Sequence, residues 1–259
     1  MREVTLLEML KRGVHFGHRE SRWHPKMRPY IYTSRQGVHI IDLEKTSRKL
    51  QEAYDFMKLQ SGKGAVVLFV GTKRQAQKIV IDAAQRAGMP YVAGRWLGGT
   101  LTNFVTVSKL IKKLKSYRQS RDSGGFEKYT KKEQLEFTKE IKRLEDLIGG
   151  IETLQKLPDV VFVEDVKQES TAVREARKMG VPIVGLVDTN ANPDLLDYPI
   201  PANDDATKSL ELLVSLMADA IVEGRASVPQ PSAPAVSEEE KIEKKAEEAH
   251  SETAPVPIV

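Results

Sequence analysis

The chain has 259 residues, 40% of them hydrophobic, and no cysteine, which excludes disulfides, thiolate zinc sites and a cysteine nucleophile. No apolar run approaches the roughly 20 residues of a membrane-spanning helix, so a soluble, cytoplasmic protein is expected. Residues 226–259 hold 3 of the 40 Lys and Arg and 7 of the 36 Asp and Glu, which leaves 37 basic and 29 acidic residues before them. A basic body with an acidic tail indicates an anionic partner, most commonly nucleic acid.

The N-terminal region predicts a short helix followed by a basic arm. Apolar residues between positions 4 and 10 can form one helical face, and Gly13 ends the helix. Residues 14–29 then combine three histidines, several Lys and Arg residues and two aromatic rings in a loop that two prolines keep extended. Cations neutralise phosphates and flat rings stack on unpaired bases, so this composition favours RNA. The candidate contacts are His15, His18, Arg19, Arg22, Trp23, Lys26 and Arg28.

The arm has two other interpretations. Phe16 and Trp23 could anchor it to the core while the charges face water. The histidines could suggest zinc, but no carboxylate or thiol stands at a recognised ligand spacing, and no metal is expected.

Residues 30–59 predict a hairpin and then a helix. The segments 30–33 and 38–41 flank a turn that contains a glycine, as in a β-hairpin. Asp42 can cap the helix, which should cover residues 43–59.

A buried strand and a second helix follow. The apolar run 65–70 predicts the strand, and Thr72 with Gln75 predicts a capping box on a helix that reaches residue 87. Backbone amides at this helix start could hold a phosphate. The side chains that would assist them are Lys73 and Arg74.

The motifs of nucleotide-binding proteins and common hydrolases are missing. The segment Gly62-Lys63-Gly64 precedes its strand instead of following it, so it is no Walker A motif. Neither the dinucleotide fingerprint nor the nucleophile elbow or zinc-protease motif occurs. We therefore expect no catalytic activity and no cofactor.

A glycine-rich loop at residues 94–104 offers a second group of candidate contacts. Its glycines allow the backbone to approach a partner closely, and its cation and hydroxyls could contact phosphates. The candidates are Arg95, Trp96 and Thr100. The alternative is that the tryptophan packs in the core and the glycines only make turns.

Residues 107–157 predict a protruding antiparallel coiled-coil hairpin. Apolar residues recur at helical spacing in two segments on either side of a turn at 123–125, and the second segment steps alternately by four and three. Its charged outer faces could simply be solvated, or could grip a large partner through cations such as Lys112 and Lys113.

Residues 158–194 predict a βαβ unit and therefore a parallel sheet in an α/β domain. Asp165 stands at the expected N-cap of the helix, which Gly180 ends. Asp188 follows the second strand, where it could meet Asp204 or Asp205 and bind a cation, although helix capping explains Asp165 and Asp205 more simply.

The chain should close with a helix and an unstructured tail. The helix is expected over residues 206–223, capped by the polar segment 203–205. Residues 226–259 are rich in Pro, Ala, Glu and Lys, which predicts a disordered tail.

Several stretches together resemble the ribosomal protein S2 family of the bacterial small ribosomal subunit. They are LLEMLKRGVHFGH with RWHPKMRPYIY, then GRWLGGTLTNF, and finally PDVVFVEDVKQESTAVREARKMGVPIVGLVDTN with IPANDDA. The resemblance covers about residues 4–224 in the family's order. It implies a flavodoxin-like α/β domain formed by residues 1–103 and 158–225, an inserted coiled-coil hairpin at 104–157 and no catalytic activity.

The resemblance also implies a function. Family members bind small-subunit rRNA on the solvent side between head and body, and help to dock ribosomal protein S1, which captures mRNA. The main alternative is a stand-alone flavodoxin-like nucleotide-binding or regulatory protein. A third interpretation is that the helical hairpin binds other proteins and that the contacts with RNA are incidental.

Overall fold

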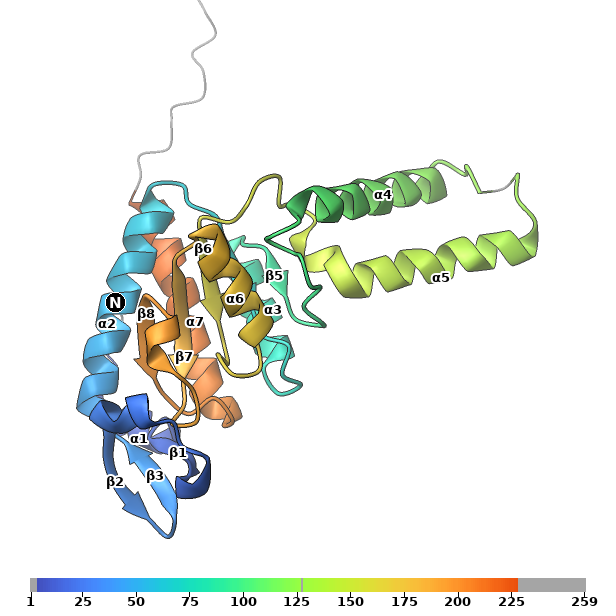
Figure 1. Cartoon of the computed structure of the whole chain (residues 1–259). Helices are drawn as coiled ribbons and strands as arrows, with labels where there is room; N and C mark the ends of the chain where they lie inside the picture. Colours follow the sequence, from blue (N-terminus) through green and yellow to red (C-terminus); the bar gives the residue numbers. More distant parts are fainter. Residues whose placement is uncertain (1–3, 127, 228–259) are drawn as a thin grey trace, which may run out of the picture.

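The computed structural model describes residues 4–126 and 128–227 (Figure 1). Its centre is a five-stranded parallel sheet with the strand order β5-β4-β6-β7-β8. The three inner strands are β4 (Val67–Val70), β6 (Val160–Val163) and β7 (Ile183–Val187), and every residue in them is buried. This confirms the interpretation of the apolar runs as strands covered on both faces.

The two edge strands were not predicted from the sequence. They are β5 (Tyr91–Val92) and β8 (Tyr198–Pro201). Two residues are too few to produce a pattern, and the prolines of β8 argue against an ordinary strand. They are tolerated because β8 pairs on one side only, with β7.

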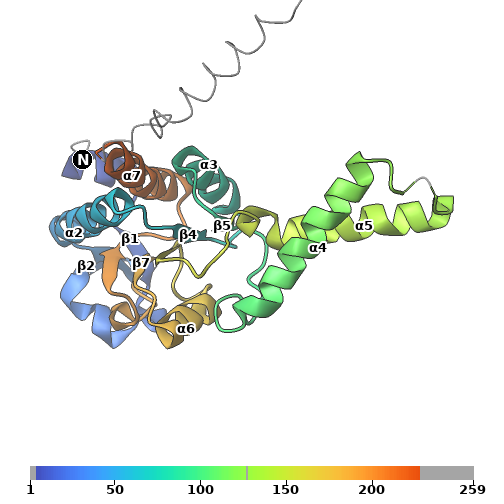
Figure 2. The same cartoon turned by 90° about the horizontal axis from the view of Figure 1, so that it is seen from above.

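Helices cover both faces of the sheet (Figure 2). One layer consists of α2 (Leu43–Gly62), α3 (Gln77–Ala87) and α7 (Thr207–Ala226). The other contains α6 (Ser170–Met179) and the root of the helical hairpin. Alternate residues of β4 divide accordingly, since Val67 and Phe69 join the core under α2, α3 and α7 while Leu68 and Val70 join the core under α6.

The helical hairpin extends away from the sheet (Figure 1). It consists of α4 (Phe104–Asp122) and α5 (Lys131–Ile148), and the short η3 (Gly149–Ile151) ends its second arm. The expected apolar seam is confirmed, because these side chains are buried: Val107, Ile111, Leu114, Ile141, Leu144 and Ile148. No helix in the described part of the chain is long and apolar enough to cross a membrane.

The N-terminal arm is a folded element, and the expectation of an extended loop is wrong. Its β1 (Phe16–Arg19) pairs with β3 (Val38–Ile41), which also pairs with β2 (Ile31–Arg35) in a small antiparallel sheet. Between them lie the 3-10 helices η1 (Glu20–Arg22) and η2 (Pro25–Tyr30). Proline opens η2 because its fixed φ suits a first helical turn and its missing amide would have no helical partner there.

The helix ends were predicted with mixed success. Gly88 and Gly180, at φ 62° and 68°, end α3 and α6 in the left-handed conformation as expected. The capping box of Thr72 and Gln75 is wrong, since α3 begins at Gln77 without a side-chain cap.

Two further helix starts differ from expectation. Asp165 accepts hydrogen bonds from the amides of Lys167 and Gln168, but it caps a turn that precedes α6. Before α7, the amides of Asp205 and Ala206 donate to Asn203, so neither of the following aspartates is the cap.

The first helix, α1 (Leu6–Lys11), buries less than expected. Met9 is fully buried, but the three leucines on the expected apolar face are between 44% and 57% exposed. The predicted tail lies outside the described residues beyond position 227, and α7 itself runs to Ala226.

Candidate nucleic-acid interface

The N-terminal arm is held against the carboxyl end of β7. The amide of His18 donates to the Thr189 hydroxyl at 2.8 Å, and the amide of His24 donates to the Thr189 carbonyl at 2.7 Å. A Cβ on Gly17 would lie 2.6 Å from the Thr189 side chain, so only glycine allows this approach. The arm is therefore fixed by backbone contacts.

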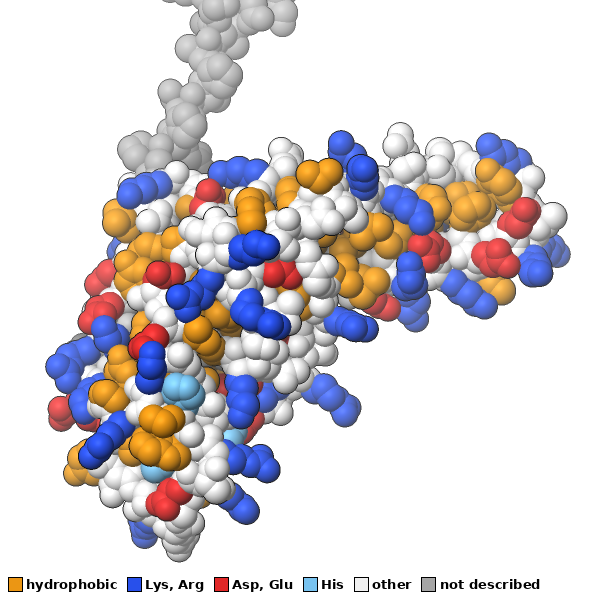
Figure 3. Space-filling model, viewed as in Figure 1, with side chains coloured by type: hydrophobic (Ala, Val, Ile, Leu, Met, Phe, Trp, Pro, Cys, Tyr) orange, Lys and Arg blue, Asp and Glu red, His pale blue; other side chains and the backbone are white. Residues whose placement is uncertain are grey.

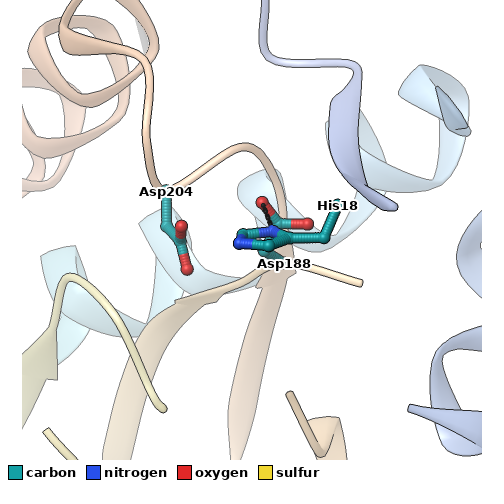
Figure 4. Close-up of side chains that lie close together, drawn as sticks. All are labelled: His18, Asp188 and Asp204. Carbon is teal, nitrogen blue, oxygen red and sulfur yellow. Dashed lines mark ion pairs between the residues drawn. The ribbon is translucent and has the colours of Figure 1, made fainter. Parts of the chain in front are cut away.

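The imidazole of His18 adds an electrostatic anchor (Figure 4). Its Nδ1 lies 2.9 Å from Asp188 and its Nε2 lies 3.5 Å from Asp205. The hydrogen bond to Asp188, together with the neighbouring carboxylates, raises the pKa of His18 against the opposing effect of burial. His18 was predicted to contact RNA, but it points into the protein and ties the arm to β7.

The cations of the arm point outward. Arg19, Arg22 and Arg28 are exposed, and none forms an ion pair with another described residue. Lys26 is exposed as well but pairs with Asp194. A rigid arm with free guanidinium groups is preorganised for phosphate contact, because the backbone needs no ordering on binding.

The two aromatic candidates of the arm differ. Trp23 is 38% exposed, with its ring centroid 5.5 Å from that of His39, so part of its face is open to a partner. His15 is partly buried beside Phe16, and burial lowers its pKa. His15 is therefore neutral at pH 7 and offers a ring and a weak acceptor instead of a charge.

Lys73 lies at the carboxyl end of the sheet, surrounded by acids. Its Nζ is 3.1 Å from Asp165, 3.0 Å from Asp204 and 2.7 Å from Asp205. Burial lowers the pKa of Lys73, but these carboxylates outweigh burial and raise the pKa strongly. The ammonium is thus engaged inside the protein, whereas the neighbouring Arg74 is exposed. This arrangement disfavours the phosphate site expected at this helix start.

The carboxylates around Lys73 are strongly perturbed. Burial raises the pKa of Asp204 to about 7 and that of Glu164 to about 9. Within the described part of the chain, one oxygen of Asp204 and both oxygens of Glu164 have no hydrogen-bond partner. His18, Asp188 and Asp204 each place one possible metal-ligand atom, a ring nitrogen or a carboxylate oxygen, within 4.8 Å of the other two. This spacing would allow the three atoms to bind one cation.

The glycine-rich loop is folded around one buried carboxylate. Glu175 of α6 accepts hydrogen bonds from the Trp96 indole at 3.1 Å and from three loop amides. Trp96 is 9% exposed, and the buried Thr100 hydroxyl donates to the Leu97 carbonyl. For these two candidates the structure favours packing over RNA contact, and Arg95 alone of the three is exposed.

The hairpin candidates lie on the outer face of α4. Lys112 is exposed and unpaired among the described residues, while Lys113 pairs with Glu140 at 3.1 Å and lies over the Tyr117 ring. Such an exposed pair holds Lys113 only weakly, so both lysines remain accessible to a partner.

Sequence analysis did not identify the carboxylates that hold the candidate RNA-contact residues in place. Asp188 and Asp205 were considered for a cation or a helix cap, yet they hold His18. Nothing in the sequence marked Glu175 as a residue that organises the loop, because a lone acid on a helix is usually solvated. Asp188 did carry a signal, since it follows an apolar strand at the edge where α/β sheets place their ligands.

Comparison with known proteins identifies the family. The chain matches the family described as Ribosomal protein S2 over residues 9–224. It is 51% identical over 225 residues to the small ribosomal subunit protein uS2 of Coprothermobacter proteolyticus, which covers 87% of this chain and 84% of that protein. The resemblance seen in the sequence is therefore confirmed, and the chain belongs to the ribosomal protein S2 family.

Proposed function

We propose that the chain binds small-subunit rRNA between head and body, on the solvent side, and helps to dock ribosomal protein S1 for mRNA capture. Membership of the family makes it a structural component of the small ribosomal subunit and not an enzyme. The finer assignment rests on the family resemblance and on the distribution of charge over the surface.

The observation that carries the RNA assignment is the fixed arm with its free cations. Contacts with Thr189, Asp188 and Asp205 hold the arm, and its three unpaired arginines project from it. Arginine donates in a planar fork that matches phosphate geometry and also stacks on bases. The exposed part of Trp23 adds a stacking surface next to them.

The helical hairpin supports a role in protein docking. It extends away from the sheet and exposes Val105 and Leu135, at 69% and 55%, on a largely charged surface. An inserted module of this shape can reach a neighbouring protein while the α/β domain stays on RNA.

The alternative of a nucleotide-binding flavodoxin-like protein finds support only in the strand order, which is that of flavodoxin-like sheets. A phosphate at the carboxyl end of these strands would meet Asp165, Asp204 and Asp205, with Lys73 already neutralised by them. The electrostatics therefore oppose it.

The test replaces Arg19, Arg22 and Arg28 by Gln together and measures binding of the full chain to small subunits from which this protein has been washed out by salt. We expect at least about tenfold weaker binding, and a slope of log affinity against log salt that is smaller by about 2, because each phosphate contact contributes about 0.7 to 0.9. The melting temperature should stay unchanged. Undiminished binding, or an equal loss of folding stability, would contradict the assignment.

A further inference from the structure

In the segment from Glu164 to Gly180, every acidic side chain is buried and every basic side chain is exposed. It contains four acidic and four basic residues, so its formal charge is zero. All four acids, Glu164, Asp165, Glu169 and Glu175, are buried. All four bases, Lys167, Arg174, Arg177 and Lys178, are exposed. The exposed surface of this segment, most of which is α6, is therefore cationic although the segment has a formal charge of zero.

The buried acids do not neutralise this exposed surface. Asp165 forms an ion pair with Lys73, and Glu175 accepts hydrogen bonds from the glycine-rich loop. Glu169 accepts from the amide and hydroxyl of Thr72. These three acids have partners inside the protein, and Glu164, whose pKa burial raises to about 9, is uncharged at pH 7. No acid of the segment therefore pairs with the cations outside.

The exposed cations are not held by carboxylates, although Arg174 donates hydrogen bonds to the Ser170 carbonyl at 3.3 Å and to the Thr171 hydroxyl at 3.4 Å. No ion pair joins Lys167, Arg174, Arg177 or Lys178 to any residue in the described ranges. Figure 3 shows Lys and Arg side chains gathered over the part of the surface where Figure 1 places α6. Asp194 and Asp197 share a small hollow with Arg177, but Asp194 pairs with Lys26 and Asp197 accepts from the amide of Ile183.

Helix stabilisation does not explain the whole group. Arg177 and Lys178 lie in the last turn of α6, where cations favour the helix dipole. Lys167 precedes the first turn, where a cation is unfavourable, and Arg174 repels both cations that follow it at spacings of three and four. Helix stabilisation therefore accounts for only two of these four cations.

The glycine-rich loop is bound to α6 through the buried Glu175. Glu175 lies in the middle of α6 and binds the amides of Gly99, Leu101 and Thr102, so the loop is fixed beside the helix. The exposed Arg95 belongs to this loop and adds a cation to the segment that is fixed to α6.

We propose that the outer face of α6 with the turn before it, formed by Lys167, Arg174, Arg177 and Lys178 and extended by Arg95 of the glycine-rich loop, is a second rRNA-docking surface that binds the phosphate backbone. The proposal rests on the proposed function and adds a surface separate from the N-terminal arm. RNA is favoured over an acidic protein because Arg174 and Arg177, with their planar forks of donors, follow the exposed hydroxyls of Ser170 and Thr171, and both kinds of group donate to phosphate oxygens.

The test compares two variants with the same loss of charge. The α6 variant carries Gln in place of Lys167, Arg174, Arg177 and Lys178. The control carries Gln in place of Arg48, Lys63, Lys78 and Lys208, which are exposed, unpaired among the described residues and located on the helical layer across the sheet. Binding to salt-stripped small subunits is measured at several salt concentrations.

The α6 variant should bind at least about tenfold more weakly, with a salt slope smaller by about 3, and the control should bind like the parent protein. Undiminished binding by the α6 variant, or an equal loss in the control, overturns the proposal. If only the arm variant of Arg19, Arg22 and Arg28 loses binding, the proposed function stands and this surface fails. If neither variant loses binding, both fail.

A second measurement does not depend on the folding of the α6 variant. Since the chain has no cysteine, Ser170→Cys provides a unique attachment point for a tethered iron chelate that cleaves nearby RNA. Cleavage of rRNA in reassembled subunits from this position, and none from Lys208→Cys, is expected. Absence of cleavage from position 170, combined with weaker binding of the α6 variant, would identify an acidic protein as the partner and refute the RNA assignment.

Discussion

Replacing Glu175 by Gln should loosen the glycine-rich loop. The carboxylate has five donors: the Trp96 indole at 3.1 Å, the amides of Gly99, Leu101 and Thr102 at 2.8, 3.0 and 3.2 Å, and the Thr102 hydroxyl at 3.2 Å. In Gln, one oxygen becomes an amide nitrogen that cannot accept. At least two loop N–H groups then lose their partner.

The magnitude follows from the number of orphaned donors. Each buried donor without a partner costs about 1 to 3 kcal/mol, so two cost about 2 to 6 kcal/mol, and about 3 kcal/mol is expected here because the amide of Gly99 is only partly buried. For a protein of this size the melting temperature should fall by roughly 6 to 12 °C. The pKa of Glu175 lies below its ordinary value, because the hydrogen bonds from the loop outweigh burial. Its stabilising effect is therefore present above the unfolded pKa and is lost as pH falls through the folded value.

Thermal unfolding and tryptophan fluorescence test this prediction. Trp23→Phe leaves Trp96 as the single tryptophan, whose emission should shift to longer wavelength when the loop opens. Glu136→Gln on the exposed face of α5 removes the same charge and should change the free energy of unfolding by less than about 0.5 kcal/mol. An unchanged melting temperature and unchanged emission in Glu175→Gln would refute the view that this carboxylate organises the loop.

Two further predictions concern the core. Because burial raises the pKa of Glu164 to about 9, the folded state holds a proton that the unfolded state releases above about pH 4.5, so stability should fall between pH 5 and 8. Glu164→Gln should flatten this dependence of the melting temperature and stabilise the protein by roughly 3 kcal/mol at pH 7, and an equally steep dependence would contradict it. Replacing Ile141 and Leu144, 3% and 1% exposed, by Asp should open the hairpin, seen as protease cleavage within α4 and α5. Global unfolding would contradict the inserted-module interpretation.

Much of the fold was predictable because its patterns are local. Four-residue to six-residue apolar runs marked β4, β6 and β7, and heptad-like spacing marked the hairpin seam. Positive φ at Gly88 and Gly180 places a glycine where each helix ends. These features follow from the preferences of neighbouring residues and need no information about the rest of the chain.

The candidate site was predictable in composition but not in orientation. The sequence placed the cations of the arm and the cysteine-free, basic character of the body correctly. It could not say that Arg19 faces water while His18 faces Asp188, or that Trp96 is buried. Which way a side chain points in an irregular loop depends on partners that are distant in sequence.

The sequence by itself determined the family, the parallel sheet, the helical hairpin and the excess of basic residues. Only the tertiary structure decided which charges are available to a partner. Lys73 and Arg74 are neighbours, yet the first is enclosed by three aspartates and the second is exposed. The physical reason is that charge compensation acts through space. Acids more than 90 positions away in the sequence enclose Lys73, while the cations on the outer face of α6 have no carboxylate partner among the described residues.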